Sequence, residues 1–85
     1  MSDQPVYQTK VSSDALNVLA ATQSERLIRK IQRVVEAYAK GDNKPKEILN
    51  FPSPNWFYHD DPEFLLVFTI NADKNVLVLD MACIK

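Results

Sequence analysis

The strongest constraint on the fold is a pair of apolar segments near the end of the chain, joined by a short polar turn. Residues 64–70 and 76–82 are almost entirely apolar, and residues 71–75 between them are mostly polar. A turn this short joins antiparallel neighbours, because parallel strands need a long crossover. The near-continuous apolar character predicts two strands that are covered on both faces or lie centrally in the sheet. A further strand is expected at residues 56–58, before the turn at residues 60–63.

The first half of the chain predicts one strand and two helices. Residues 6–11 alternate with a period of two and are rich in β-branched and aromatic side chains, which favours a first strand. Residues 12–14 are helix-capping types, and apolar residues follow them at helical spacing, which predicts a short first helix.

The second helix has the clearest pattern in the chain, and we place it at residues 23–40. Thr22 and Glu25 stand three residues apart, as in a capping box, and Gly41 is suited to the left-handed position after the last turn. One stripe of the helix is apolar: Leu27, Ile31, Val34, Val35 and Tyr38. Three prolines interrupt regular structure over residues 42–54, where residues 46–49 are expected to form a single turn.

Composition limits the chain to one small domain and excludes several classes of function. With 85 residues the chain has room for a single core, so we expect one domain over residues 1–85. The only glycine, Gly41, excludes glycine-rich loops that bind phosphates or dinucleotides, and we expect no cofactor. The only cysteine, Cys83, excludes an intrachain disulfide and a zinc cage, and favours a reducing compartment. Without an apolar leader or a run of about 20 apolar residues, a cytoplasmic protein with no membrane contact is expected.

Charge is distributed unevenly along the chain, although the net charge is only −1. Residues 26–46 hold seven cations and two anions, whereas residues 47–85 hold two cations and six anions. Four cations fall on one side of the second helix, away from the apolar stripe, and Lys40 joins them. Such a row can bind phosphates or an acidic protein, and the alternative is an ordinary solvated helix face. Six cations are therefore candidates for binding a partner or nucleic acid: Arg26, Arg29, Lys30, Arg33, Lys44 and Lys46.

His59 is the only histidine, and Asp60, Asp61 and Glu63 follow it closely. This group suggests acid–base or metal chemistry. Consecutive residues of an extended strand point to opposite faces, however, and residues 60–63 also form a good turn, so a structural or solvent-exposed His59 is the alternative. Because a lone histidine seldom marks a metal site, we expect no metal site and assign no catalytic residue.

Two other side-chain groups have a functional and a structural interpretation. A nucleophilic pair of Cys83 and His59 requires the strand ends to meet, whereas Cys83 alone is more typical of a small buried apolar residue. The aromatic residues 56–58, with Phe51 and Phe64, are suited to stacking on bases, but in so small a domain they are more often needed for the core.

The predicted order of strand, two helices, proline-containing loop and antiparallel meander resembles the RelE/ParE superfamily of type II toxin–antitoxin toxins. Residues 6–16 resemble the opening strand of that family, followed by Ser-x-x-Ala and an apolar helix. Residues 64–68, Phe-Leu-Leu-Val-Phe, lie where the family commonly has Tyr-Arg-Leu/Val-x-Tyr, and residues 75–81 lie where it has its last long strand. The resemblance covers most of the chain and implies an α+β fold of the order β-α-α-β-β-β.

The chain departs from the family pattern at positions that the resemblance links to nuclease chemistry. Leu65 stands at the central arginine of the family, and residues 81–85 stand at its Gly-His-Arg-like ending. An aliphatic side chain cannot activate a nucleophile, protonate a leaving group or stabilise a charged phosphorane. Lys44 and Lys46 lie near the loop where RelE-like nucleases carry basic residues, and Lys85 is a candidate for a terminal cation.

These observations predict a non-enzymatic, catalytically degenerate RelE/ParE-like protein that binds a protein partner, either an antitoxin-like peptide or a host complex. The first alternative is a type II toxin that is still active against translation, through mRNA or the ribosome, or against DNA gyrase, and is neutralised by an antitoxin. The second alternative is an enzyme that depends on His59. A homodimer is also compatible with the sequence, because an uncovered strand edge or apolar patch favours self-association.

Overall fold

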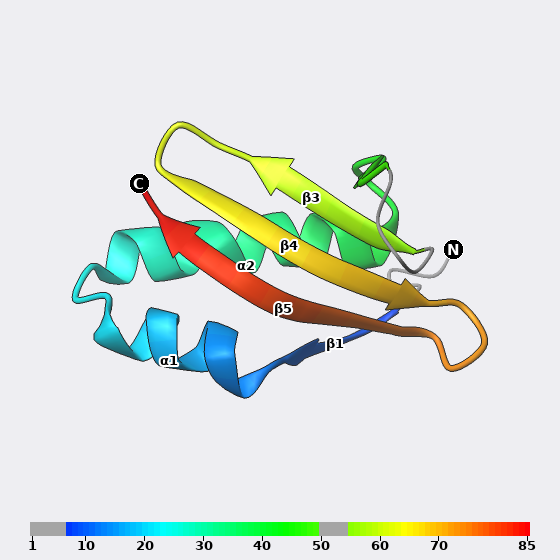
Figure 1. The fold of residues 1–85 in the computed structure, drawn as a ribbon, viewed down its shortest axis with the longest axis horizontal. Coiled ribbons are helices and arrows are strands. Elements are labelled where there is room, and N and C mark those ends of the chain that lie inside the picture. The colour runs from blue at the N-terminus through cyan, green and yellow to red at the C-terminus, as the bar shows by residue number, and fades with distance from the viewer. Residues whose placement is uncertain (1–6, 50–54) are drawn as a thin grey trace.

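The chain forms two helices and a five-stranded mixed sheet (Figure 1). The computed structural model describes residues 7–49 and 55–85, so that Val6 and part of the proline-containing loop lie outside the described residues. The sheet has the strand order β1-β5-β4-β3-β2, in which β1 runs parallel to β5 and all other neighbours are antiparallel. The predicted α+β fold is confirmed. Its elements are β1 (Gln8–Val11), α1 (Ser13–Ala21), α2 (Glu25–Lys40), β2 (Lys46–Glu47), β3 (Trp56–Asp60), β4 (Phe64–Asn71) and β5 (Val76–Ile84).

The ends of the helices are fixed by local side chains, one of which differs from the prediction. Ser24 caps α2, because its hydroxyl accepts a hydrogen bond from the Leu27 amide at 3.3 Å. The predicted capping box of Thr22 with Glu25 is therefore wrong: Thr22 ends α1, and its hydroxyl donates to the Val18 carbonyl at 2.9 Å. Gly41 ends α2 with φ of 83°, as predicted, since only glycine takes this backbone without steric cost.

Residues 46–49 do not form the predicted turn. Lys46 and Glu47 form the short edge strand β2, which pairs with Tyr58 and Phe57 of β3. Pro45 disfavours a helical backbone in the residue before it, so the chain approaches the sheet in an extended form. The open edge of β3 then provides backbone partners that no local pattern reveals.

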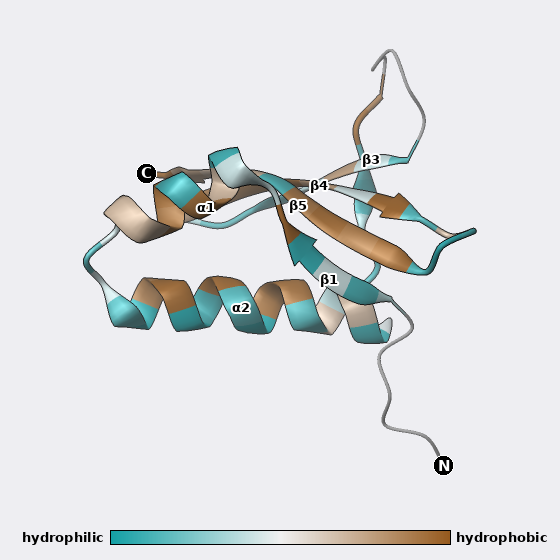
Figure 2. Ribbon diagram, turned by 90° about the horizontal axis from the view of Figure 1, so that it is seen from below, coloured by the Kyte–Doolittle hydropathy of each residue, from teal (hydrophilic) through white to brown (hydrophobic). Residues whose placement is uncertain are grey.

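The core lies between α2 and one face of the sheet. Figure 2 shows α2 running along this face, whereas no helix lies over the opposite face of β4 and β5. The buried apolar side chains of the sheet are Phe64, Leu66 and Phe68 from β4 and Leu77, Leu79 and Ala82 from β5, and they pack in one cluster with Ile31, Val35 and Tyr38 of α2. The predicted central position of β4 and β5 is confirmed, but helices cover only one of their faces.

Candidate functional site

One face of the sheet has no helix over β4 and β5 and presents several apolar side chains. Side chains alternate between the two faces along a strand, so the neighbours of buried Leu66 and Phe68 point away from α2. Cross-strand partners share a face, which extends this set to β3 and β5. We call this surface the open face, and it comprises Trp56, Tyr58, Leu65, Val67, Thr69, Val78, Asp80, Met81 and Cys83. Met81 of β5 is 54% exposed, whereas the apolar open-face residues of β4, Leu65 and Val67, are half-buried.

A β-bulge places one carboxylate midway along β5, on the open face. Val67 pairs with Met81 and Phe68 pairs with Leu79, so Asp80 is an extra residue in β5 without a partner in β4. The Thr69 hydroxyl donates to Asp80 Oδ2 at 2.9 Å, and the Ser12 hydroxyl donates to the Asp80 carbonyl at 2.7 Å. Both the backbone and the side chain of Asp80 are thus held in place. The sequence pattern shows only a single acidic residue in an apolar run, so this position was missed.

Leu65 also lies on the open face, between Asp60 of β3 and Cys83 of β5. Its aliphatic side chain cannot donate a hydrogen bond or carry charge, so Leu65 itself offers only apolar contact. Lys85, the candidate terminal cation, forms an ion pair with Asp60 at the same corner of the sheet. Cys83 is exposed, so the expectation of a buried cysteine is wrong.

The candidate cations on α2 differ in whether they already form ion pairs within the chain. Arg26 donates two hydrogen bonds to Glu63, and Lys30 Nζ lies 3.0 Å from Glu63 Oε1 and 3.3 Å from Asp61 Oδ1. Hydrogen bonds from Arg26 and then Lys30 lower the pKa of Glu63 to about 2. These ion pairs join the first turns of α2 to the β3–β4 turn. Arg29 approaches Glu25 at 3.8 Å, and Arg33 is exposed and forms no ion pair with the described residues.

Four of the candidate cations lie between Arg26 and Arg33 of α2, whereas Lys44 and Lys46 follow its C-terminal end. These two lysines line a cavity of about 300 Å³ together with Tyr38, Tyr58 and His59. A role of any of these cations in binding a partner or nucleic acid stays a prediction.

His59 is a structural neighbour of the core on the face opposite to Asp60. The Tyr38 hydroxyl lies 2.6 Å from His59 Nδ1, and the imidazole ring stacks on Phe64 at a centroid distance of 6.2 Å. Burial is the main cause that lowers the pKa of His59, which favours the neutral ring and lets Tyr38 donate to Nδ1. The Asp61 carboxylate forms an ion pair with Lys30. Within residues 7–49 and 55–85, no three His, Cys, Asp or Glu side chains lie close enough together to hold a metal ion. His59 and Cys83 also face opposite sides of the sheet and do not form a pair.

The aromatic segment of β3 divides between the two faces. Phe57 stacks on Phe68 in the core, with ring centroids 5.8 Å apart. Trp56 and Tyr58 lie on the open face by their pairing with Thr69 and Val67. The expectation that these rings serve the core therefore holds for Phe57, whereas the other two contribute to the uncovered surface.

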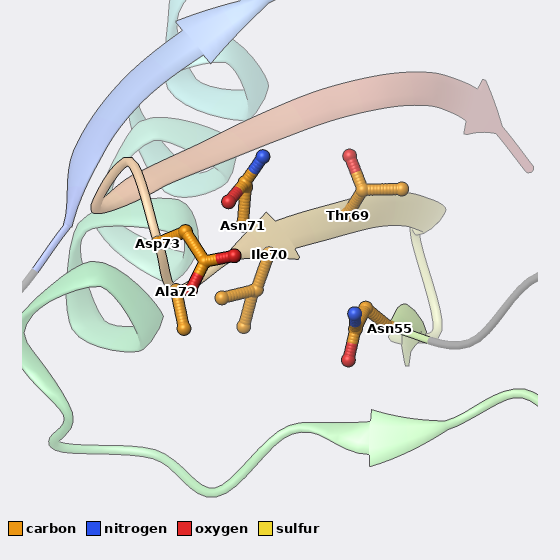
Figure 3. Close-up of a pocket in the computed structure, with 6 residues that line it drawn as sticks. All are labelled: Asn55, Thr69, Ile70, Asn71, Ala72 and Asp73. Carbon is orange, nitrogen blue, oxygen red and sulfur yellow. The ribbon is translucent and has the colours of Figure 1, made fainter.

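A second, polar cavity lies at the end of the open face, beside the β4–β5 turn (Figure 3). It has a volume of about 430 Å³, and Asn55, Thr69, Ile70, Asn71, Ala72 and Asp73 line it. Asn71 Oδ1 accepts a hydrogen bond from the Lys74 amide, so this side chain already stabilises the turn. Asn55, which has a positive φ of 70°, is joined to β4 by the hydrogen bond from the Ile70 amide to its carbonyl.

The one-sided sheet, with two helices between its first and second strands, is the arrangement of a RelE-like fold. The chain is similar to a chain of the RelBE2 toxin–antitoxin complex from Mycobacterium tuberculosis, with a TM-score of 0.76 and 12% identity over 99% of this chain and 98% of that chain. It is also similar to a chain of the intact RelBE toxin–antitoxin complex from E. coli, with a TM-score of 0.63 and 19% identity over 93% and 96%. These similarities confirm the fold that the resemblance implied. No protein-family model and no curated protein matches the sequence. None of the described helices has the length and apolar character needed to cross a membrane.

Proposed function

We propose that this chain is the toxin of a toxin–antitoxin pair, that it acts through the open face, and that a protein antitoxin neutralises it by covering that face. The observation that carries the proposal is the combination of structural similarity to chains of two toxin–antitoxin complexes, over nearly the whole chain, with a sheet face that no helix covers. Apolar side chains that stay partly exposed on a sheet face without a covering element are typical of an interaction site. Translation and DNA gyrase are the targets to be tested.

The test is expression of the chain in a bacterial host, followed by growth, amino-acid incorporation and plasmid supercoiling. Val67→Glu places a charge on the open face, and Gln32→Glu places the same charge on the exposed side of α2. We expect the unchanged chain and Gln32→Glu to arrest growth, and Val67→Glu to relieve the arrest while keeping the far-UV spectrum of the folded protein. Normal growth in cells that accumulate the folded, unchanged chain would overturn the proposal.

A second candidate is a catalytically degenerate relative that acts by protein binding alone. The aliphatic side chain of Leu65 on the open face favours it, because this position offers no group for acid–base or charge stabilisation. The two candidates differ in an RNA cleavage assay on translating ribosomes. If the unchanged chain cleaves RNA and Val67→Glu does not, the chain is not a catalytically degenerate relative. If the chain arrests growth without cleaving RNA, it acts as a toxin by binding alone.

A further inference from the structure

Asp80 is a carboxylate that the fold fixes midway along β5, on the open face. It lies at the β-bulge beside Val67 and Met81, and the Thr69 hydroxyl holds its Oδ2. Within residues 7–49 and 55–85, Oδ1 has no hydrogen-bond partner and no ion pair joins Asp80 to a cation. In the isolated chain, water therefore solvates this half-buried carboxylate.

Covering the open face with an apolar surface removes that water. A carboxylate that loses its solvation without gaining a cation is strongly unfavourable, since one neutral hydroxyl cannot compensate the charge. Arginine suits the position best, because its guanidinium is weakly hydrated and binds carboxylates in a bidentate manner. A helix laid on a sheet face is also a standard way to complete a layered domain.

We infer that the partner of the open face is an amphipathic helix that carries one arginine or lysine within its apolar stripe, placed opposite Asp80. This inference rests on the proposed function only in taking the antitoxin as the natural source of the helix. Asp80 then acts as a specificity-determining residue: helices with an uninterrupted apolar stripe are rejected because they leave the charge unpaired.

Lys10 is the nearest rival to a cation from the partner. It lies opposite Val78 on β1, on the open side of the sheet, and forms no ion pair with Asp80. A long lysine side chain could turn towards the carboxylate when the face is covered. The experiment must therefore separate a cation supplied by the helix from Lys10.

The probe is a phage-displayed library of helical peptides, each with one apolar face. Every second residue of that apolar face is randomised. Peptides selected on the full chain are retained when Val67→Glu abolishes their binding, which places them on the open face. The tightest retained peptide is then compared with its cation-to-methionine form on four proteins: the unchanged chain, Asp80→Leu, Asp80→Asn and Lys10→Gln.

We expect retained peptides to be enriched in one arginine or lysine within the stripe. Replacing it by methionine should weaken binding to the unchanged chain at least tenfold, equivalent to about 1.4 kcal/mol, and change binding to Asp80→Leu less than twofold. Lys10→Gln should leave the tenfold ratio intact. Retained peptides without a cation, or an equal loss on Asp80→Leu, would overturn the inference. Because this assay does not depend on toxicity, normal growth of the expressing host would refute the proposed function without deciding the role of Asp80.

Discussion

Two adjacent leucines of β4 provide a matched test of the one-sided sheet. Leu66 is completely buried against the core beneath α2, whereas Leu65 is half-exposed on the open face. Changing each to alanine removes the same atoms from the same strand. Only the environment of the side chain differs, so the two free energies of unfolding report directly on how well each face is covered.

The expected losses follow from these environments. Leu66→Ala removes three buried carbon atoms, at about 0.8 kcal/mol each, and the cavity raises the total to about 2.5–5 kcal/mol. Leu65→Ala leaves no closed cavity, because water reaches the site, and should cost about 1 kcal/mol or less. A domain of 85 residues has a total stability of about 4–13 kcal/mol, so Leu66→Ala is close to the limit of a folded protein.

The assay is urea denaturation followed by the fluorescence of Trp56, the only tryptophan, with circular dichroism as a second probe. With a denaturant dependence of about 1 kcal/mol per molar urea, the midpoint of Leu66→Ala should fall by at least about 2 M, against about 1 M or less for Leu65→Ala. Equal losses would refute the reasoning, because they would mean that the open face is covered in the purified protein. A loss for Leu65→Ala that grows with protein concentration would identify a homodimer as that cover.

Three further predictions concern single contacts. The pKa of Glu63 is lowered to about 2, so its ion pair with Arg26 stabilises the fold fully above about pH 4.5, and this stability is lost as pH falls towards 2. The Tm of Glu63→Gln should therefore fall less between pH 5 and pH 2.5 than the Tm of the unchanged chain. Identical pH profiles of the two proteins would contradict this. Tyr38→Phe removes the hydrogen-bond donor to the neutral His59 ring. An NMR titration of this single histidine should then show its pKa raised towards the ordinary value, and the variant should lose about 1 kcal/mol of stability. A lowered pKa of His59 in this variant would exclude the hydrogen bond. Gly41→Ala should cost about 1 kcal/mol in thermal unfolding, because alanine disfavours φ of 83°, and an unchanged Tm would refute that cause.

Local patterns predicted the elements but not their partners. The apolar stripe of α2 and its terminal Gly41 are periodic or single-residue signals, and both were identified correctly. The capping residue of α2 was assigned wrongly, because Thr22 and Ser24 are both good caps and only the packing of α1 decides which hydroxyl is used. The strand β2 was missed, because two residues carry no measurable period.

The sequence by itself determined the α+β class, the C-terminal end of α2 at Gly41, and the antiparallel pairing of the last two strands, since these depend on neighbours a few residues apart. Only the tertiary structure decided which charges neutralise one another. Arg26 and Glu63 are 37 residues apart, and their pairing follows from the β3–β4 turn lying beside α2. The structure also decided that one sheet face is left uncovered and that a bulge fixes Asp80 within it, because cross-strand register is a relation between distant segments that no local spacing encodes.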